Sequence, residues 1–342
     1  MAVTVDVTDA KELTLAVNND KDSRRFLASF FKPLDHQTRD IMIDFVEGSQ
    51  KLAPFVRDGD SATVSHRGGY KSRFVHAYGI ELKRPTHAFD CLKRLPGEQP
   101  IYSGKAVSPS VRAAELAGRD LKELKNRVYR TVEKIISDGF FGGKFDITDK
   151  DGKKIDSVDL GRSSSHVLTK EWGASYDGIS TDLDDMATLI NEDSGLTATD
   201  VILGKTAHAK IQKNTKFMKD LDTKNLDGVR AAMNFKMEGI GARLVGTIGG
   251  GLRVWRYDEV FKNAAGDKVS IIPANGVLML SDEMQATLHR GIIGDNDIGW
   301  FEGEFAADTW YEKDPSTQWL RLRSAPLPIC EQIDATCVAT IA

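Results

Sequence analysis

Seven histidines are the residues of this sequence best suited to bind a metal ion or to transfer a proton. They are dispersed along the chain: His36, His66, His76, His87, His166, His208 and His289. No two of them have the His-x-x-x-His or His-Glu-x-x-His spacing that places two zinc ligands on one face of a helix. The Gly-x-Ser-x-Gly turn of serine hydrolases is also absent from the sequence. The spacing therefore predicts structural histidines, no catalytic residue, no metal site and no cofactor.

A glycine-rich segment, Gly246-Thr-Ile-Gly-Gly-Gly251, is the second candidate for chemistry, because such segments can bind a phosphate. It lacks the Lys-Ser/Thr pair of a P-loop, and an extended segment rather than a helix follows it. Glycine supplies the positive φ that tight turns need, so the pattern favours a hairpin tip. A cytosolic α/β enzyme that binds a phosphorylated ligand at residues 246–251 stays open as an alternative function.

Two acidic groups could bind a hard cation. Asp182, Asp184 and Asp185 lie in the first turn of an expected helix, where carboxylates stabilise the positive end of the helix dipole without a metal. Asp295 and Asp297 lie between glycines, which is typical of a turn, and the twelve-residue calcium-loop pattern is absent. We interpret both groups as structural.

The composition is that of a folded protein without a strong electrostatic partner. Hydrophobic residues make up 41% of the 342 positions, which is enough for a sizeable core. The net charge of −4 argues against a broad basic face that binds DNA or an acidic membrane. Cys91, Cys330 and Cys337 match no zinc pattern and are expected to be reduced thiols. Because no leader and no long apolar run is found, we expect assembly in the cytoplasm and no membrane partner.

Residues 1–48 are expected to form an N-terminal arm. Within it, Phe26, Phe30 and Phe31 have helical spacing and are followed by Pro33, so this cluster must bury one side. The cluster can pack against its own domain or against a neighbouring subunit, and the pattern does not distinguish the two. We treat the three phenylalanines as candidate arm contacts.

Residues 49–105 carry charges of both signs and only scattered apolar residues. Two strand-like pieces, residues 61–65 and 73–78, flank a turn at Gly68 and Gly69. A two-stranded ribbon is marginal by itself in water, and a connection of this length is usually functional. We therefore expect an extended loop that lies on a neighbouring subunit. The candidate intersubunit contacts are Arg67, Gly68, Gly69, Tyr70 and Arg73.

The strongest single element is a helix over residues 108–138. Apolar residues recur there at steps of three and four: Ala114, Ala117, Leu121, Leu124, Val128, Val132 and Ile135. Gly139 is the expected C-cap. The opposite side carries charged residues and is expected to face solvent or another subunit. A coiled coil is the competing interpretation, although the stripe is short for one.

The remainder mixes helices with strands, so the expected class is α+β. The sequence predicts a hairpin over residues 145–160, helices over 182–193 and 206–213, and a buried strand over 200–204. Further strands are expected at residues 243–247, 252–257, 269–272, 277–280, 319–323 and 337–341.

Five short blocks occur in a definite order along the chain. They are Arg67-Gly68-Gly69, residues 92–96 (Leu-Lys-Arg-Leu-Pro), residues 158–162 (Val-Asp-Leu-Gly-Arg) followed by Trp172 and Asp182, residues 324–327 (Ser-Ala-Pro-Leu), and the final strand at 338–342. In this order the chain resembles the major capsid (head) proteins of lambda-like tailed bacteriophages, the phage capsid protein E family. The resemblance extends over almost the whole sequence.

The resemblance implies the Hong Kong 97 phage capsid fold. That fold has an N-terminal arm, an extended loop, a peripheral domain with a long spine helix, and an axial domain. On this sequence the arm is placed at 1–48, the extended loop at 49–105, and the peripheral domain at 106–190 with the spine helix at 108–138. The axial domain is placed at 191–299, and residues 300–342 are expected to be C-terminal strands that return to the peripheral domain.

The same resemblance implies a function without catalysis. It implies a major capsid protein that self-assembles into hexamers and pentamers of an icosahedral phage head around packaged double-stranded DNA. The implied partners are further copies of the chain, a scaffolding protein, a portal and a decoration protein, with DNA contacted only by non-specific proximity. The implied location is the virion capsid, after assembly in the host cytoplasm. An encapsulin-like shell protein shares this fold and is an alternative, ahead of the enzyme.

Overall fold

A computed structural model describes the chain at residues 10–19, 25–46, 70–87, 90, 109–173, 176–221, 241–249, 251–263, 266–295, 299–314 and 316–342. Several positions named above lie outside these residues: the expected strand at 61–65, the turn at Arg67, Gly68 and Gly69, Cys91, and the block at 92–96. Within the described residues, none of the helices has the length and apolar character needed to span a membrane.

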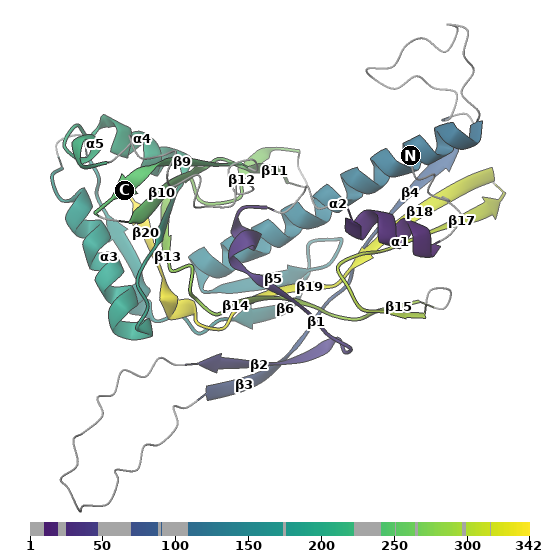
Figure 1. Cartoon of the computed structure of the whole chain (residues 1–342), viewed down its shortest axis with the longest axis horizontal. Helices are drawn as coiled ribbons and strands as arrows, with labels where there is room; N and C mark the ends of the chain where they lie inside the picture. The colour runs from purple at the N-terminus through teal and green to yellow at the C-terminus, as the bar shows by residue number, and fades with distance from the viewer. Residues whose placement is uncertain are drawn as a thin grey trace, which may run out of the picture.

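Helix α2 (Pro109–Gly142) is a long diagonal rod across the molecule in Figure 1. Its buried side follows the predicted stripe through Leu121, Leu124, Val128 and Val132. The predicted apolar face of this helix is therefore correct.

The predicted end of this helix at Gly139 is wrong, because the helix continues to Gly142. Gly143 takes a φ of 68°, and its N–H donates to the Gly139 carbonyl at 3.0 Å, so the left-handed cap lies at Gly143. Gly139 serves close packing instead. A Cβ atom at this position would lie 3.2 Å from Leu160 Cδ1, beside the hairpin of β5 (Lys144–Thr148) and β6 (Lys154–Asp159).

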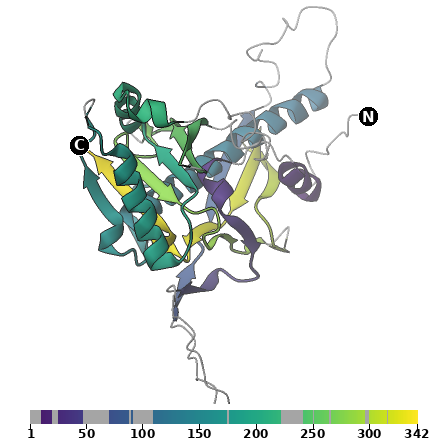
Figure 2. The same cartoon turned by 60° about the vertical axis from the view of Figure 1, so that its left-hand side comes forward.

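In the described part of the chain, the largest sheet has six strands. Their order is β7 (Val167–Lys170), β20 (Thr336–Ile341), β13 (Gly276–Leu280), β8 (Asp200–Leu203), β10 (Leu252–Tyr257) and β9 (Ala242–Ile248). β8 and β13 are buried along their full length, because they are central strands with both faces of the sheet covered. β20 runs parallel to β7 and antiparallel to β13. Helices α3 (Ile179–Ser194) and α4 (Lys205–Lys213) cover one face of the sheet, and the C-terminal half of α2 covers the other (Figures 1 and 2).

This sheet crosses the expected domain limits. β7 belongs to the segment 106–190, the strands from β8 to β13 belong to 191–299, and β20 belongs to 300–342, yet all of them pair in one sheet. The expected limit between residues 190 and 191 falls inside α3. The division into peripheral and axial domains therefore stays a prediction.

A second sheet is formed by β17 (Ala306–Lys313), β18 (Ser316–Ser324) and β4 (Ile80–His87), all antiparallel. The N-terminal half of α2 and a short helix, α1 (Ala10–Asn19), pack on it. Their common core contains Leu13, Val17, Leu121, Leu124, Val128, Phe305, Leu320 and Leu322. α2 thus contributes to two hydrophobic cores, one at each end.

Smaller elements complete the fold. A three-stranded sheet joins β1 (Lys32–Asp35), β14 (Ala286–Arg290) and β19 (Pro326–Cys330). Two-stranded ribbons are formed by β2 (Asp40–Val46) with β3 (Tyr70–His76), β11 (Val260–Lys262) with β12 (Lys268–Ser270), and β15 (Ile293–Asp295) with β16 (Gly299–Phe301). The short helices are η1 (Leu27–Phe30), η3 (Ser164–His166), α5 (Phe217–Asp220) and η4 (Ile333–Ala335).

Most elements predicted from periodicity are found near their expected positions. They are the hairpin at 145–160, the helices at 182–193 and 206–213, and the strands at 200–204, 243–247, 252–257, 277–280, 319–323 and 337–341. The expected strand at 269–272 ends at Ser270, because Ile271 and Ile272 turn into the core and are 2% and 1% exposed. The expected strand at 73–78 begins at Tyr70 and ends at His76. The patterns in the sequence did not predict α1, α5, β1, β2, β4, β7, β11, β14, β15, β16, β17 or β19.

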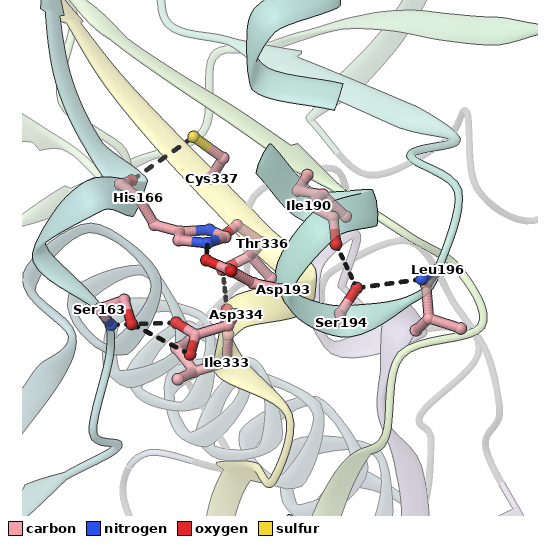
Figure 3. A network of polar contacts seen from close by, with 10 residues as sticks. All are labelled: Ser163, His166, Ile190, Asp193, Ser194, Leu196, Ile333, Asp334, Thr336 and Cys337. Atoms are coloured by element: carbon pink, nitrogen blue, oxygen red, sulfur yellow. Dashed lines mark hydrogen bonds and ion pairs between the residues drawn. The ribbon is translucent and has the colours of Figure 1, made fainter. Parts of the chain in front are cut away.

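A buried polar network joins η3, α3 and β20 (Figure 3). The ring of His166 is fully buried, with Nδ1 at 2.9 Å from the Thr336 carbonyl oxygen and Nε2 at 2.7 Å from the Asp193 carboxylate. Beside it, the Ser163 N–H donates to the Asp334 carboxylate at 3.0 Å. Because these partners come from elements far apart in sequence, His166 holds the C-terminal strand and the end of α3 in place.

We expect the substitution His166→Phe to lower the free energy of unfolding by about 2 kcal/mol, because it leaves a buried carbonyl and a carboxylate without a donor. Asp193→Asn is the matched control. The Asp193 side chain is 45% exposed, and an amide there can still hydrogen-bond His166 Nε2, so this change should cost less than about 1 kcal/mol. Urea unfolding followed by tryptophan fluorescence measures both changes, and a His166→Phe chain as stable as wild type would contradict this role of the ring.

Candidate assembly surfaces

Several of the histidines that the structure describes lie in contacts between secondary-structure elements. Among the residues that the structure describes, no three His, Cys, Asp or Glu side chains are grouped so that they could hold a metal ion. His36 Nε2 lies 2.8 Å from His289 Nδ1, and His76 Nδ1 lies 2.6 Å from Asp40 Oδ1. These pairs join neighbouring strands and do not form a metal site.

The glycine-rich segment is the tip of the hairpin between β9 and β10. Gly246 lies within β9 opposite Val254, while Gly249 and Gly251 take positive φ values of 54° and 157°. The strand β10, and not a helix, follows the turn. This is the hairpin that the pattern favoured, and it offers no helix N-terminus to a phosphate.

The acidic group at the start of α3 is part of a buried ion pair. Asp182 is 4% exposed and accepts hydrogen bonds from Lys170 Nζ at 2.7 Å and from Trp172 Nε1 at 2.9 Å. These two donors were not identified from the sequence, although both stand within twelve residues of Asp182. In the second acidic group, Asp295 ends β15 opposite Gly299, and Asp297 lies outside the described residues.

Cys330 and Cys337 are free and buried. Burial raises the pKa of the Cys330 thiol to about 12 and that of the Cys337 thiol to about 11. Because the thiolate is the reactive form, both side chains act as small core residues.

The β2–β3 ribbon has two different faces. Ile41, Ile43 and Val75 lie on the inner face and are 2%, 2% and 3% exposed. On the outer face, Met42 is paired with Phe74, and these side chains are 58% and 71% exposed. An apolar pair of this size is therefore presented to solvent on a ribbon whose other face already contributes to the core.

Polar pairs enclose this apolar pair on the outer face. On one side His76 contacts Asp40, and on the other Ser72 Oγ donates to Asp44 Oδ1 at 2.5 Å. Both pairs are exposed, and both lie across the ribbon in register with Met42 and Phe74. The result is a small apolar patch with a polar rim, which is the usual composition of a protein contact surface.

The residues predicted as loop contacts are only partly described. Arg67, Gly68 and Gly69 lie outside the described residues, and Tyr70 is the first residue of β3, opposite Val46. The Arg73 side chain is exposed, and its Nη2 donates to the Ser157 carbonyl of the same chain at 3.4 Å. Met42 and Phe74 were not predicted as contacts. Their signal is the pairing of two apolar residues on the polar side of alternating strands.

A groove of about 1600 Å³ runs along the outward side of α2. The β5–β6 hairpin, the β11–β12 hairpin and the start of β4 form its walls. Apolar side chains line part of it: Ile135, Ile147, Ile155, Val260 and Phe261. Ile155 and Val260 are 50% and 44% exposed. Charged residues of both signs surround them: Arg127, Arg130, Lys134, Asp138, Lys144, Asp146, Lys262 and Lys268.

The predicted arm phenylalanines pack inside their own chain. The ring of Phe26 is 1% exposed and lies 5.1 Å from the ring of Trp255 and 5.6 Å from that of Tyr257, measured between centroids. Phe30 packs edge-to-face on Phe26 at 5.4 Å, and Phe31 lies 5.7 Å from Phe140. Of the two alternatives left open by the sequence, the structure has the first, packing against the chain's own body.

A buried carboxyl group fixes this part of the arm to α2. Glu133 is 0% exposed, and its two oxygens accept the backbone N–H groups of Leu27 at 3.2 Å and Ala28 at 2.8 Å. The Tyr257 hydroxyl lies 2.7 Å from Glu133 Oε2 and 2.9 Å from Glu259 Oε2, so one phenolic proton faces two carboxyl groups. Burial, opposed by these hydrogen bonds, raises the pKa of Glu133 to about 7.

The pKa of Glu133 determines the sign of a pH effect. Because the folded chain binds this proton more tightly than the unfolded chain, the free energy of unfolding should fall as pH rises from about 4.5 to 7, by up to about 3 kcal/mol. Glu133→Gln cannot ionise, but its amide nitrogen faces a backbone N–H that a carboxyl oxygen accepts in the wild type. The variant should therefore be less stable than wild type at pH 5 and lose this part of the pH dependence, as measured by urea unfolding from pH 5 to 8.5.

Glu123 provides a control of opposite sign on the exposed side of the same helix. Hydrogen bonding to Arg84 lowers the pKa of Glu123 to about 2. Glu123→Gln should therefore weaken the chain at neutral pH, with no effect below the pKa of the ionised group. A Glu133→Gln variant that keeps the wild-type fall in stability between pH 5 and 7 would contradict the assignment of the neutral carboxyl.

Comparison with known proteins gives one family. The sequence matches the family described as phage major capsid protein E over residues 9–341. No curated protein matches the sequence.

Solved structures with the same fold include three that resemble this chain over most of its length. A capsid protein of a prophage in E. coli CFT073 has a TM-score of 0.78 at 17% identity, with 98% of this chain and 99% of that chain covered. A phage-related protein from Bordetella bronchiseptica RB50 has a TM-score of 0.58 at 11% identity, with 98% and 97% covered. A chain of Gordonia phage Cozz has a TM-score of 0.50 at 10% identity, with 93% and 87% covered.

At these identities the structural matches establish the fold alone. The mixed helix and strand architecture is that of Hong Kong 97-like phage capsid proteins, which confirms the fold class expected from the resemblance. The family match includes nearly every residue that the structure describes. The chain belongs to the phage major capsid protein E family.

Proposed function

We propose that this chain is a major capsid protein that self-assembles into the hexamers and pentamers of an icosahedral phage head enclosing double-stranded DNA. Its place is then the virion capsid, after assembly in the host cytoplasm. The role is structural and not enzymatic. The scaffolding protein, portal and decoration protein expected from the resemblance belong to the same proposal, with DNA contacted by proximity only.

The observation that supports self-assembly most directly is the exposed pair of Met42 and Phe74. Phe74 is 71% exposed, so it does not occupy the groove of its own chain. Removing an aromatic side chain from water favours association by about 2 kcal/mol. A second copy of the chain can supply the surface that the ribbon lacks.

The groove on α2 has the features of that surface. It is concave, it contains exposed apolar side chains such as Ile155 and Val260, and its rim carries both charges. The ribbon and the groove are different surfaces of one chain, so their contact is heterologous. Repeating such a contact around an axis gives a closed ring when the rotation closes, which is the geometry that hexamers and pentamers require.

Replacing Phe74 with aspartate tests the proposal. We expect Phe74→Asp subunits to fold with the thermal midpoint of wild type and to stay dispersed, because a carboxylate cannot be buried in an apolar contact without an ionic partner. Tyr311→Asp is the control, since Tyr311 is also exposed at 61% but lies on β17. Sedimentation velocity and negative-stain microscopy measure assembly. Closed shells from Phe74→Asp would overturn the role of the ribbon.

Mixed disulfides test the groove. In a Cys91→Ser background, one variant carries Phe74→Cys and a second carries Ile155→Cys. Mixed before assembly and oxidised afterwards, they should give a disulfide-linked pair of chains, which neither variant gives alone. Shells that form without this pair would place the ribbon on another surface of the neighbour.

The contents of purified shells distinguish the alternative shell protein. A phage head assembled with its packaging machinery should contain nuclease-protected DNA, whereas an encapsulin-like compartment should contain a cargo protein. The enzyme alternative loses its support, because the glycine segment on which it depended is a hairpin turn.

A further inference from the structure

Helix α1 lies along an open edge of the second sheet (Figure 1). In the part of the chain that the structure describes, β17 has a strand neighbour, β18, on one side only. Edge strands present unpaired N–H and C=O groups and readily pair with another chain, so natural proteins cover or distort them. The hydrogen bonds between α1 and this edge show how the helix covers it.

The side chains of α1 reproduce the bonds of a neighbouring strand. Thr14 Oγ1 accepts the Ala307 N–H at 3.0 Å and donates its own proton to the Ala307 carbonyl at 3.1 Å. In an antiparallel sheet, one residue of the partner strand exchanges this same pair of bonds. One helical turn later, Asn18 Nδ2 donates to the Phe305 carbonyl at 2.9 Å. Thr14 and Asn18 thus satisfy the edge groups at residues 305 and 307.

Apolar packing and a buried lysine hold α1 in this position. Leu13 and Val17 are 3% and 5% exposed, and Leu15, on the opposite side of the helix, is 63% exposed. Lys125 is 2% exposed, and its Nζ donates to the Val17 carbonyl at 2.7 Å. This lysine lies over the Tyr129 and Phe305 rings, at 5.8 and 5.6 Å from their centroids. A cation at the C-terminal end of α1 also matches the helix dipole.

We propose that α1 is a cover for the β17 edge and that, when α1 is displaced, this edge pairs with the β17 edge of a second copy. Two identical edges can pair as antiparallel strands about a twofold axis, because residue i of one copy then meets residue j of the other and residue j meets residue i. Such a dimer is closed and isologous, and it differs from the ribbon-to-groove contact of the proposed ring. The inference goes beyond shell formation, since it concerns an interaction that the free subunit must avoid.

The full chain with Thr14→Val and Asn18→Ala tests the cover. Valine keeps the shape of threonine and removes both bonds to Ala307. At a dilution where the subunits stay monomeric, we expect the Ala307 amide to exchange its hydrogen at least about tenfold faster, measured by exchange mass spectrometry. At higher concentration we expect the subunits to form dimers in sedimentation velocity. Leu15→Ala is the matched control on the exposed side of α1, and it should change neither result. If the Ala307 amide stays protected in the monomeric double variant, Thr14 does not close the edge and the proposal is wrong.

The substitution Ala307→Pro distinguishes strand pairing from non-specific hydrophobic association of the uncovered core. The Ala307 N–H is bonded to Thr14 and not to β18, so Ala307→Pro removes an outward donor and is tolerated on an edge strand. Added to Thr14→Val and Asn18→Ala, it should abolish the dimer and leave the faster exchange of neighbouring edge amides unchanged. Dimers that persist with this proline, or release of α1 without any dimer, would overturn the proposed edge contact.

Discussion

The burial of one side of α2 by two separate cores is the constraint on which the rest of the structure depends. The N-terminal half of the helix places Leu121, Leu124 and Val128 in the core that α1 and the β17–β18–β4 sheet share. The C-terminal half places Val132, Ile136 and Phe140 in the core beneath the six-stranded sheet. A helix is stiff over this length, so it fixes the two sheets relative to one another. The side of α2 that faces neither core lines the groove.

Buried polar groups supply the specific links between these cores. Glu133 joins α2 to the arm, His166 joins η3 to α3 and β20, and Asp182 joins α3 to the segment that follows β7. Each of them accepts or shares hydrogen bonds with groups from another element, which satisfies the requirement that buried polar atoms be paired. Apolar packing alone would tolerate small shifts of these elements, whereas a buried carboxyl group has a defined set of donors.

Elements with a local periodic pattern could be predicted from the sequence. Elements whose role depends on contacts with residues distant in sequence could not. The stripe of α2 and the apolar run of β8 are visible because burial repeats with the period of the element. Gly139 was assigned to a helix end, but its small size serves the contact with Leu160, which no local pattern contains. α1 was missed because only Leu13 and Val17 form its apolar side. For the candidate surfaces, the ribbon was expected, while Met42 and Phe74 become significant only when register places them opposite one another.

The position of β20 has a consequence for the order of folding. Residues 336–341 occupy an interior place in the six-stranded sheet, between β7 and β13. Until the ribosome has made and released them, the fully apolar β13 has an open side and β7 has no strand to pair with. The sheet therefore closes only after residues 336–341 have been synthesised, long after the strands that they join. Until then the nascent chain exposes an apolar strand edge, which favours aggregation.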